Sequence, residues 1–138
     1  MPISFIGLIR VKSLRTLDIS KNKLKTLGQI SQLNELKTLK CDDNALGSNA
    51  LQPLSKLSKL QILTLGNNRI QYPDSAAATT SPQTFPSLPP NVKQLKLNSN
   101  SFSSIPLQIC DRTLPIEKLD LSYNNLAAIP PEICNLSE

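Results

Sequence analysis

Three cysteines and two adjacent aspartates are the residues whose types could most readily carry chemistry. Cys41, Cys110 and Cys134 form no CxxC pair, and the sequence holds no histidine to complete a zinc site or activate a nucleophile. Asp42 and Asp43 could hold a metal, but side chains of adjacent residues at a strand end point apart, which favours a solvated acidic turn. The sequence therefore predicts no catalytic residue, no cofactor site and no metal site.

The remaining motifs are weak. With four glycines the chain has neither GxxxxGK[ST] nor GxGxxG, so no phosphate-binding loop is expected. Ser81-Pro82 could be a site for a proline-directed kinase, although a simple turn is the stronger interpretation. The odd number of cysteines argues against a disulfide framework, and all three are predicted to be small buried core residues. Cysteine usage thus favours a reducing, intracellular and cytoplasmic setting.

Composition limits the core and the partners. Hydrophobic residues make up 39% of the 138 residues and aromatic residues only 4%, so the core must be built from leucine and isoleucine. No apolar run approaches the roughly 18 residues that span a bilayer. The net charge of +5 is uneven: residues 1–60 carry ten basic and four acidic side chains, and residues 61–138 carry five and six. This excess favours a lysine-rich solvated surface, with an acidic partner as the alternative.

The elements that position these residues follow one repeated frame, L-x-x-L-x-L-x-x-N-x-L. It occurs five times in order, starting at Leu14, Leu36, Leu60, Val92 and Ile116. Its asparagines are Asn22, Asn44, Asn68, Asn100 and Asn124, separated by 22, 24, 32 and 24 residues. A period of 20 to 29 residues with one longer interval indicates a stacked repeat architecture.

This frame resembles the leucine-rich-repeat family over nearly the whole chain, from about Phe5 to Leu136. The early units resemble the 22-residue class of phosphatase-regulatory subunits. The last two, with Ile105-Pro106 and Ile129-Pro130, resemble the 23 to 24 residue class of Ras-binding scaffolds. The resemblance implies an α/β solenoid, an arc with a parallel concave sheet of about five strands. Helical or 3₁₀ turns are expected on the convex side over Asn49–Lys59 and Pro131–Leu136.

The physical reason for the frame lies in strand geometry. In L-x-L both leucines point to one side of a strand, and the residues beside them point to the other. One unit cannot cover its apolar side, so parallel units must stack and share a core. The asparagine amide can donate and accept hydrogen bonds, and it is expected to satisfy backbone groups of its own and the next unit. These asparagines are therefore interpreted as structural.

Residues between the inward leucines define the predicted partner-binding rows. The first row is Thr16, Thr38, Ile62, Gln94 and Lys118, and the second is Asp18, Lys40, Thr64, Lys96 and Asp120. A third comprises Ser20, Asp42, Gly66, Asn98 and Ser122, with Tyr123 beside it. Mixed charges and hydroxyl groups suit a polar contact with a protein and disfavour nucleic acid, which requires one sign of charge interleaved with aromatic rings.

The whole chain is expected to form one leucine-rich-repeat domain. It is interrupted at 71–90 by a loop rich in proline, serine and alanine, ordered at its roots and mobile in its middle. Neither end carries a polar cap, which favours a chain that is incomplete at its C-terminus, with self-association through uncapped ends as the alternative.

The leading hypothesis for function is a non-catalytic scaffold that binds a protein through its concave face. Family resemblance implies a small GTPase, a phosphatase or a kinase as partner. The main alternative is a regulatory portion of a larger signalling enzyme, such as a kinase or a ubiquitin ligase. A third possibility is a basic binder of nucleic acid or acidic lipid, whose affinity would fall steeply with added salt.

Overall fold

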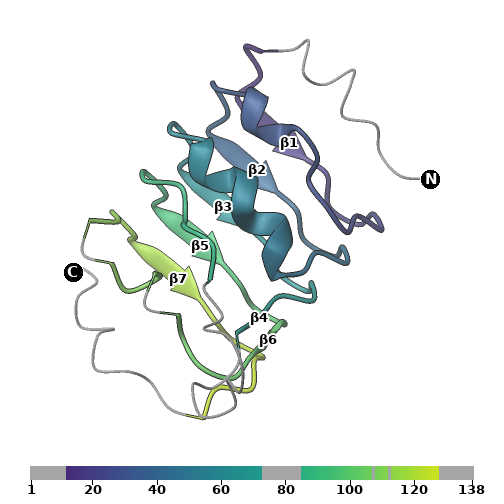
Figure 1. Ribbon diagram of the computed structural model, residues 1–138, viewed down its shortest axis with the longest axis vertical. Helices are drawn as coiled ribbons and strands as arrows, with labels where there is room; N and C mark the ends of the chain where they lie inside the picture. Colours follow the sequence, from purple (N-terminus) through teal and green to yellow (C-terminus); the bar gives the residue numbers. More distant parts are fainter. Residues whose placement is uncertain (1–11, 73–84, 107, 112, 128–138) are drawn as a thin grey trace.

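Five short strands form the parallel sheet that the repeated frame predicts. The computed structural model describes residues 12–72, 85–106, 108–111 and 113–127. Within them the sheet has the order β1-β2-β3-β5-β7, with every neighbouring pair parallel (Figure 1). Its strands are β1 (Thr16–Asp18), β2 (Thr38–Lys40), β3 (Ile62–Thr64), β5 (Gln94–Lys96) and β7 (Lys118–Asp120). The predicted fold class is confirmed.

The middle residue of each strand is a leucine that points into the core. Leu39, Leu63 and Leu95 are completely buried, whereas Leu17 and Leu119, on the two outermost strands, are only partly buried. Within the described residues, each of these two strands has a neighbouring strand on one side only, which accounts for the difference. The core is a single, mainly aliphatic cluster that runs through all five units, as stacking of thin repeats requires.

Short 3₁₀ helices cover the other side of this core. They are η2 (Ile30–Gln32) and η3 (Ser48–Lys56), which buries Ala50, Leu51 and Leu54 in the same cluster as the strand leucines. In Figure 1 η3 lies in front of β2 and β3. Helical turn was predicted for 49–59, so η3 begins one residue earlier and ends three residues sooner. The second predicted turn, 131–136, lies outside the described residues.

A second, two-stranded parallel sheet ties the interrupted region to the following unit. It pairs β4 (Gln71–Tyr72) with β6 (Ser101–Phe102). The other root of the long insertion is held by Phe85, which is buried and packs against Phe102 with ring centroids 5.8 Å apart. Of the predicted loop 71–90, residues 73–84, including Ser81, lie outside the described residues.

The asparagines link consecutive units through both ends of their amides. The Asn68 Nδ2 donates to the carbonyls of Leu65 and Gly66 in its own unit and to that of Cys41 in the preceding unit. Its Oδ1 accepts from the backbone N–H of Leu46, also in the preceding unit, at 3.1 Å. The other internal units repeat this pattern with Asn44, Asn100 and Asn124.

The expected direction of these bonds was wrong. Each asparagine was predicted to satisfy its own unit and the next, but Asn44 bonds back to Leu24 and Ile19. At these turns it is the preceding unit's backbone that lies within hydrogen-bond distance of the amide, as Ile19 O and Leu24 N do for Asn44. Among the described residues, Asn22, in the first described unit, bonds to Ile19 and Ser20 of its own unit.

The residue before each ladder asparagine lies in the left-handed region. These residues are Lys21, Asp43, Asn67, Ser99 and Tyr123, with φ between 53° and 60°. This conformation is rare outside glycine, and it is tolerated here because the asparagine side chain that follows fixes the turn.

Cys41 and Cys110 are buried thiols in the core, and Cys134 lies outside the described residues. Burial, with smaller effects of nearby Asp42 and Asp18, raises the pKa of the Cys41 thiol far above its usual range, so it is an unreactive core residue. Among the described residues, no group of histidine, cysteine, aspartate or glutamate side chains is arranged to hold a metal ion. In the same residues no helix is long and apolar enough to cross a membrane.

Candidate protein-binding face

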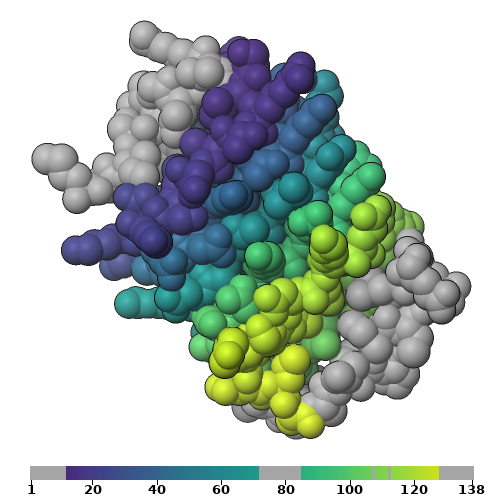
Figure 2. Space-filling model, turned by 180° about the vertical axis from the view of Figure 1, so that it is seen from behind, coloured from purple at the N-terminus to yellow at the C-terminus, as the bar shows by residue number. Residues whose placement is uncertain are grey.

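The exposed side of the five-stranded sheet, which we call the concave face, carries the predicted rows in lateral register. Thr16 pairs with Thr38, Thr38 with Ile62, Ile62 with Gln94 and Gln94 with Lys118. Thr16 and Lys118 at the two ends of this first row are exposed, and the three residues between them are half-buried. Figure 2 views the molecule from the side opposite to that of Figure 1, where successive units form parallel bands from purple to yellow.

The second row has a symmetrical charge pattern. The register places Asp18 beside Lys40 at one end and Lys96 beside Asp120 at the other, with Thr64 between the two lysines. Lys40 and Lys96 are exposed, and neither forms an ion pair within 4.0 Å among the described residues. Both ammonium groups are therefore available to a partner.

The two aspartates of this row are held in their charged form. The backbone N–H of Ser20, with smaller contributions from its hydroxyl and from Lys40, lowers the pKa of Asp18. The hydroxyl of Ser122, which donates to Asp120 at 2.6 Å, is the main cause that lowers the pKa of Asp120, followed by the Ser122 N–H. The row therefore presents fixed charges of both signs near neutral pH.

Thr64 departs from the role that the sequence suggests. Only 7% of it is exposed, and its hydroxyl donates to Asp42 Oδ2 at 2.6 Å. The other carboxylate oxygen of Asp42 accepts from the backbone N–H of Gly66 at 2.7 Å. Asp42 and Asn98 close over Gly66, where a Cβ would lie 2.6 Å from Asn98 Oδ1. Thr64 thus contributes little surface to the face.

The acidic turn at Asp42 and Asp43 is a joint between units and is more than a solvated turn. Asp42 contacts Thr64 and Gly66, and the Asp43 carboxylate accepts from the Asn67 side chain at 2.6 Å. The two carboxylates do contact different partners, as expected for adjacent residues. Both connect the second unit to the third.

Tyr123 lies just beyond the last described strand. It is 85% exposed, and it is the one large hydrophobic side chain exposed among the described residues. Its left-handed φ of 56° is set by the turn at Asn124. An exposed aromatic ring at the end of a polar face suits an anchor for a partner.

A further row precedes the first and was missed by the sequence prediction. The first variable position of each frame supplies Arg15, Lys37, Gln61, Lys93 and Glu117, all of which are exposed. Their backbones are joined laterally; for example, the carbonyl of Lys37 accepts from Gln61 N–H at 2.8 Å. The signal that could have revealed this row is charge at four of five equivalent positions. We call it the leading row.

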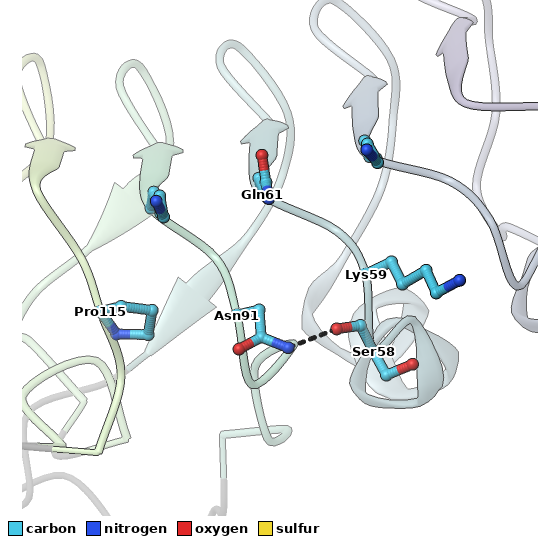
Figure 3. A pocket seen from close by; sticks show the side chains of 7 residues that line it. Ser58, Lys59, Gln61, Asn91 and Pro115 are labelled. Atoms are coloured by element: carbon cyan, nitrogen blue, oxygen red, sulfur yellow. Dashed lines mark hydrogen bonds between the residues drawn. The ribbon is translucent and has the colours of Figure 1, made fainter.

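The leading row borders a shallow pocket of about 300 Å³. Figure 3 shows Asn91 between Pro115 and Ser58, with its amide donating to the Ser58 carbonyl, and Gln61 at the start of the neighbouring strand. Lys37, Lys59 and Lys93 complete the lining. Its lining includes three lysines and two side-chain amides, and no acidic residue.

Stacked strand-and-turn units, an aliphatic core and an asparagine ladder define a repeat protein of the leucine-rich type. A model of the leucine-rich-repeat family matches residues 13–33 and 115–136. These two stretches of the chain are thus similar to the leucine-rich-repeat family. None of the curated proteins compared with it matches.

Solved structures extend the likeness to nearly the whole chain. A leucine-rich-repeat protein of Leptospira interrogans superposes with a TM-score of 0.72 at 29% identity, over 96% of this chain and 32% of that protein. The chain thus spans about a third of the length of that relative. A pollen receptor kinase 3 structure superposes with a TM-score of 0.57 at 22% identity, over 94% of this chain and 69% of that one, which shows the fold alone.

Proposed function

We propose that this chain is a non-catalytic interaction module that binds a partner protein through its concave face. The observation that carries the proposal is the second row, where Lys40 and Lys96 are exposed and free of ion pairs among the described residues, and are bracketed by Asp18 and Asp120. Fixed charges of both signs on a rigid sheet favour a partner with the complementary pattern. The likeness to leucine-rich-repeat proteins supports binding of a protein. A small GTPase, phosphatase or kinase as partner, and an intracellular location, stay predictions.

The rigidity of the face supports the proposal as well. Its side chains are set on strands joined across all five units, so the backbone that carries them is in place before a partner arrives. Binding then costs little conformational entropy in the backbone. Exposed Tyr123 adds an aromatic contact at one end of the same face.

The test replaces Lys40, Lys96 and Asp120 with alanine together. A matched control replaces Lys25, Lys56 and Asp111, which are exposed residues of the same types outside the concave face. Proteins captured from lysate by each variant are quantified by mass spectrometry, after thermal unfolding has shown that both variants fold. We expect the concave variant to lose partners that the control and the wild type retain. A folded concave variant that retains every partner would overturn the proposal.

A further inference from the structure

The pocket beside the leading row combines three lysines with side-chain amides. Its lining comprises Lys37, Lys59, Lys93, Gln61, Asn91, Ser58 and Pro115. At about 300 Å³ it is at the small end of ligand sites, large enough for side chains of a peptide and too shallow to enclose a drug-sized molecule. Its positive lining calls for a negatively charged occupant.

The three lysines differ in how closely each is paired with a carboxylate of the chain. Lys59 donates to both carboxylate oxygens of Glu35, at 2.8 and 2.9 Å. Lys93 is only loosely paired, with 4.0 Å between its Nζ and Glu117 Oε1 and both side chains about half exposed or more. Lys37 has no ion pair within 4.0 Å among the described residues. Lys37 and Lys93 are thus the two charges open to a ligand.

These two lysines flank Gln61 at equivalent positions, directly before β2 and β5, which lie on either side of β3. The Gln61 N–H donates to the Lys37 carbonyl, and the Lys93 N–H donates to the Gln61 carbonyl at 2.7 Å. Two strand spacings place the lysine backbones roughly 10 Å apart. Long lysine side chains can therefore converge on one carboxylate held above Gln61.

The same two strands repeat the lysine at their other end. The segments 37–40 and 93–96 both have the pattern Lys-x-x-Lys, and the segment between them, 61–64, is neutral. Within this central segment Ile62 is a half-buried apolar side chain on the face. The uncharged segment 61–64 is thus framed by four lysines, Lys37, Lys40, Lys93 and Lys96. This segment is roughly 10 Å long.

We propose that this frame of four lysines binds an acidic segment of the partner protein. An acidic residue of that segment sits above Gln61 between Lys37 and Lys93, an apolar residue covers Ile62, and a second acidic residue lies between Lys40 and Lys96. This inference rests on the proposed function and specifies the chemistry of the partner. Acidic residues at the edges of the frame, namely Asp18, Asp120 and Glu117, disfavour the continuous phosphate backbone of a nucleic acid.

The test uses a fluorescein-labelled peptide of sequence Glu-Glu-Leu-Glu-Glu, and its glutamine counterpart as control, in fluorescence anisotropy. The charge-reversing pair Lys37→Glu and Lys93→Glu is compared with Lys25→Glu and Lys56→Glu, which change the net charge equally at exposed sites elsewhere. We expect about tenfold weaker binding of the acidic peptide for the first pair and less than about twofold for the second, a difference of roughly 1 kcal/mol. Equal losses, no loss, or equal binding of the glutamine peptide would overturn the inference.

A single conservative change provides an independent measurement. Gln61→Glu places a carboxyl group between the two lysines without altering side-chain size. We expect its pKa, followed by NMR, to lie below the ordinary glutamate value of about 4.3, because both lysines favour the charged form. We also expect this variant to bind the acidic peptide about tenfold more weakly. An unshifted or raised pKa would contradict the proposed geometry even if every variant folds.

The two proposals fail in different ways. A partner that requires Lys40, Lys96 and Asp120 but tolerates reversal of Lys37 and Lys93 would overturn the acidic-segment inference and leave the concave-face proposal standing. A single-stranded RNA oligonucleotide that binds more tightly than the acidic peptide and depends on the same two lysines would also overturn the inference. If neither the alanine variant of the concave face nor the reversal of Lys37 and Lys93 loses a partner, both proposals are rejected.

Discussion

The two sides of the same five strands differ in how much their residue types vary from one unit to the next. On the inward side the central residue is leucine in every strand, and Leu39, Leu63 and Leu95 are fully buried. On the outward side no two neighbouring units present the same pair of residues: β2 offers Thr38 and Lys40, and β3 offers Ile62 and Thr64. Packing thus determines the residue types on the inward side. The residue types on the outward side depend instead on what that side contacts.

This contrast separates stability from recognition within three residues of chain. Inward positions lose aliphatic packing when they are truncated, because the core is close-packed and relaxes only partly. Outward positions lose mainly solvent-exposed contacts. The same strand can therefore be probed for both properties with neighbouring substitutions.

The largest expected effect is in the centre of the core. Leu63→Ala, at a completely buried position, is expected to lower the free energy of unfolding by about 3 kcal/mol. The adjacent outward change Ile62→Ala removes apolar atoms from a half-buried side chain and is expected to cost less than about 1 kcal/mol. Urea unfolding of the two variants measures both values. Comparable losses would show that β3 is not divided into a structural and a free side.

A smaller difference is expected along the asparagine ladder. Asn68→Ala removes the one side-chain acceptor of the buried Leu46 N–H, whereas the Cys41 and Leu65 carbonyls keep a second asparagine donor, Asn44 and Asn100 respectively. One orphaned donor predicts a loss of about 2 kcal/mol. Asn22→Ala at the exposed end of the ladder should cost less than about 1 kcal/mol, because Ile19 O retains Asn44. Thermal unfolding measures both losses of stability. A larger loss for Asn22→Ala than for Asn68→Ala would contradict the ladder as the source of stability.

The repeated frame predicts the fold because its fixed leucine positions determine how the strands are buried and stacked. Leucines at fixed spacing determine which side of each strand is buried, and equal spacing in each unit aligns the strands. The direction of the asparagine bonds could not be predicted, because it depends on which neighbouring backbone lies near the turn. The left-handed Lys21 and Tyr123 were likewise unexpected, since neither residue type favours that conformation.

The binding face is less predictable than the core, because its accessibility depends on contacts between units. Thr64 belongs to an outward row by spacing, yet Asp42 from the neighbouring unit binds its hydroxyl and it is buried. The pocket was missed because Ser58, Asn91 and Pro115 come from the segments that lead into the strands, where the repeat has no fixed residue. Only side-chain placement joins them to Lys37 and Lys93.

The smallest expected effect concerns the two aspartates that bracket the second row. Both have a lowered pKa, but the main cause for Asp120 is the Ser122 hydroxyl and the main cause for Asp18 is the Ser20 backbone N–H. Ser122→Ala should therefore raise the pKa of Asp120 more than Ser20→Ala raises that of Asp18. Titration of the carboxyl carbons by NMR measures both shifts.

The sign of the accompanying stability change follows from linkage. A carboxyl whose pKa is lower in the folded state contributes stability that is present above its unfolded value near 3.9, and that is lost as pH falls through the folded pKa. Ser122→Ala should therefore reduce the stability that the protein loses when the pH falls through the pKa of Asp120. Ser20→Ala should reduce the corresponding loss at Asp18 by less, because the Ser20 backbone N–H still donates to Asp18. If both serine changes raise the pKa of their aspartates equally, the two hydroxyl donors contribute alike, and the two ends of the row are electrostatically equivalent.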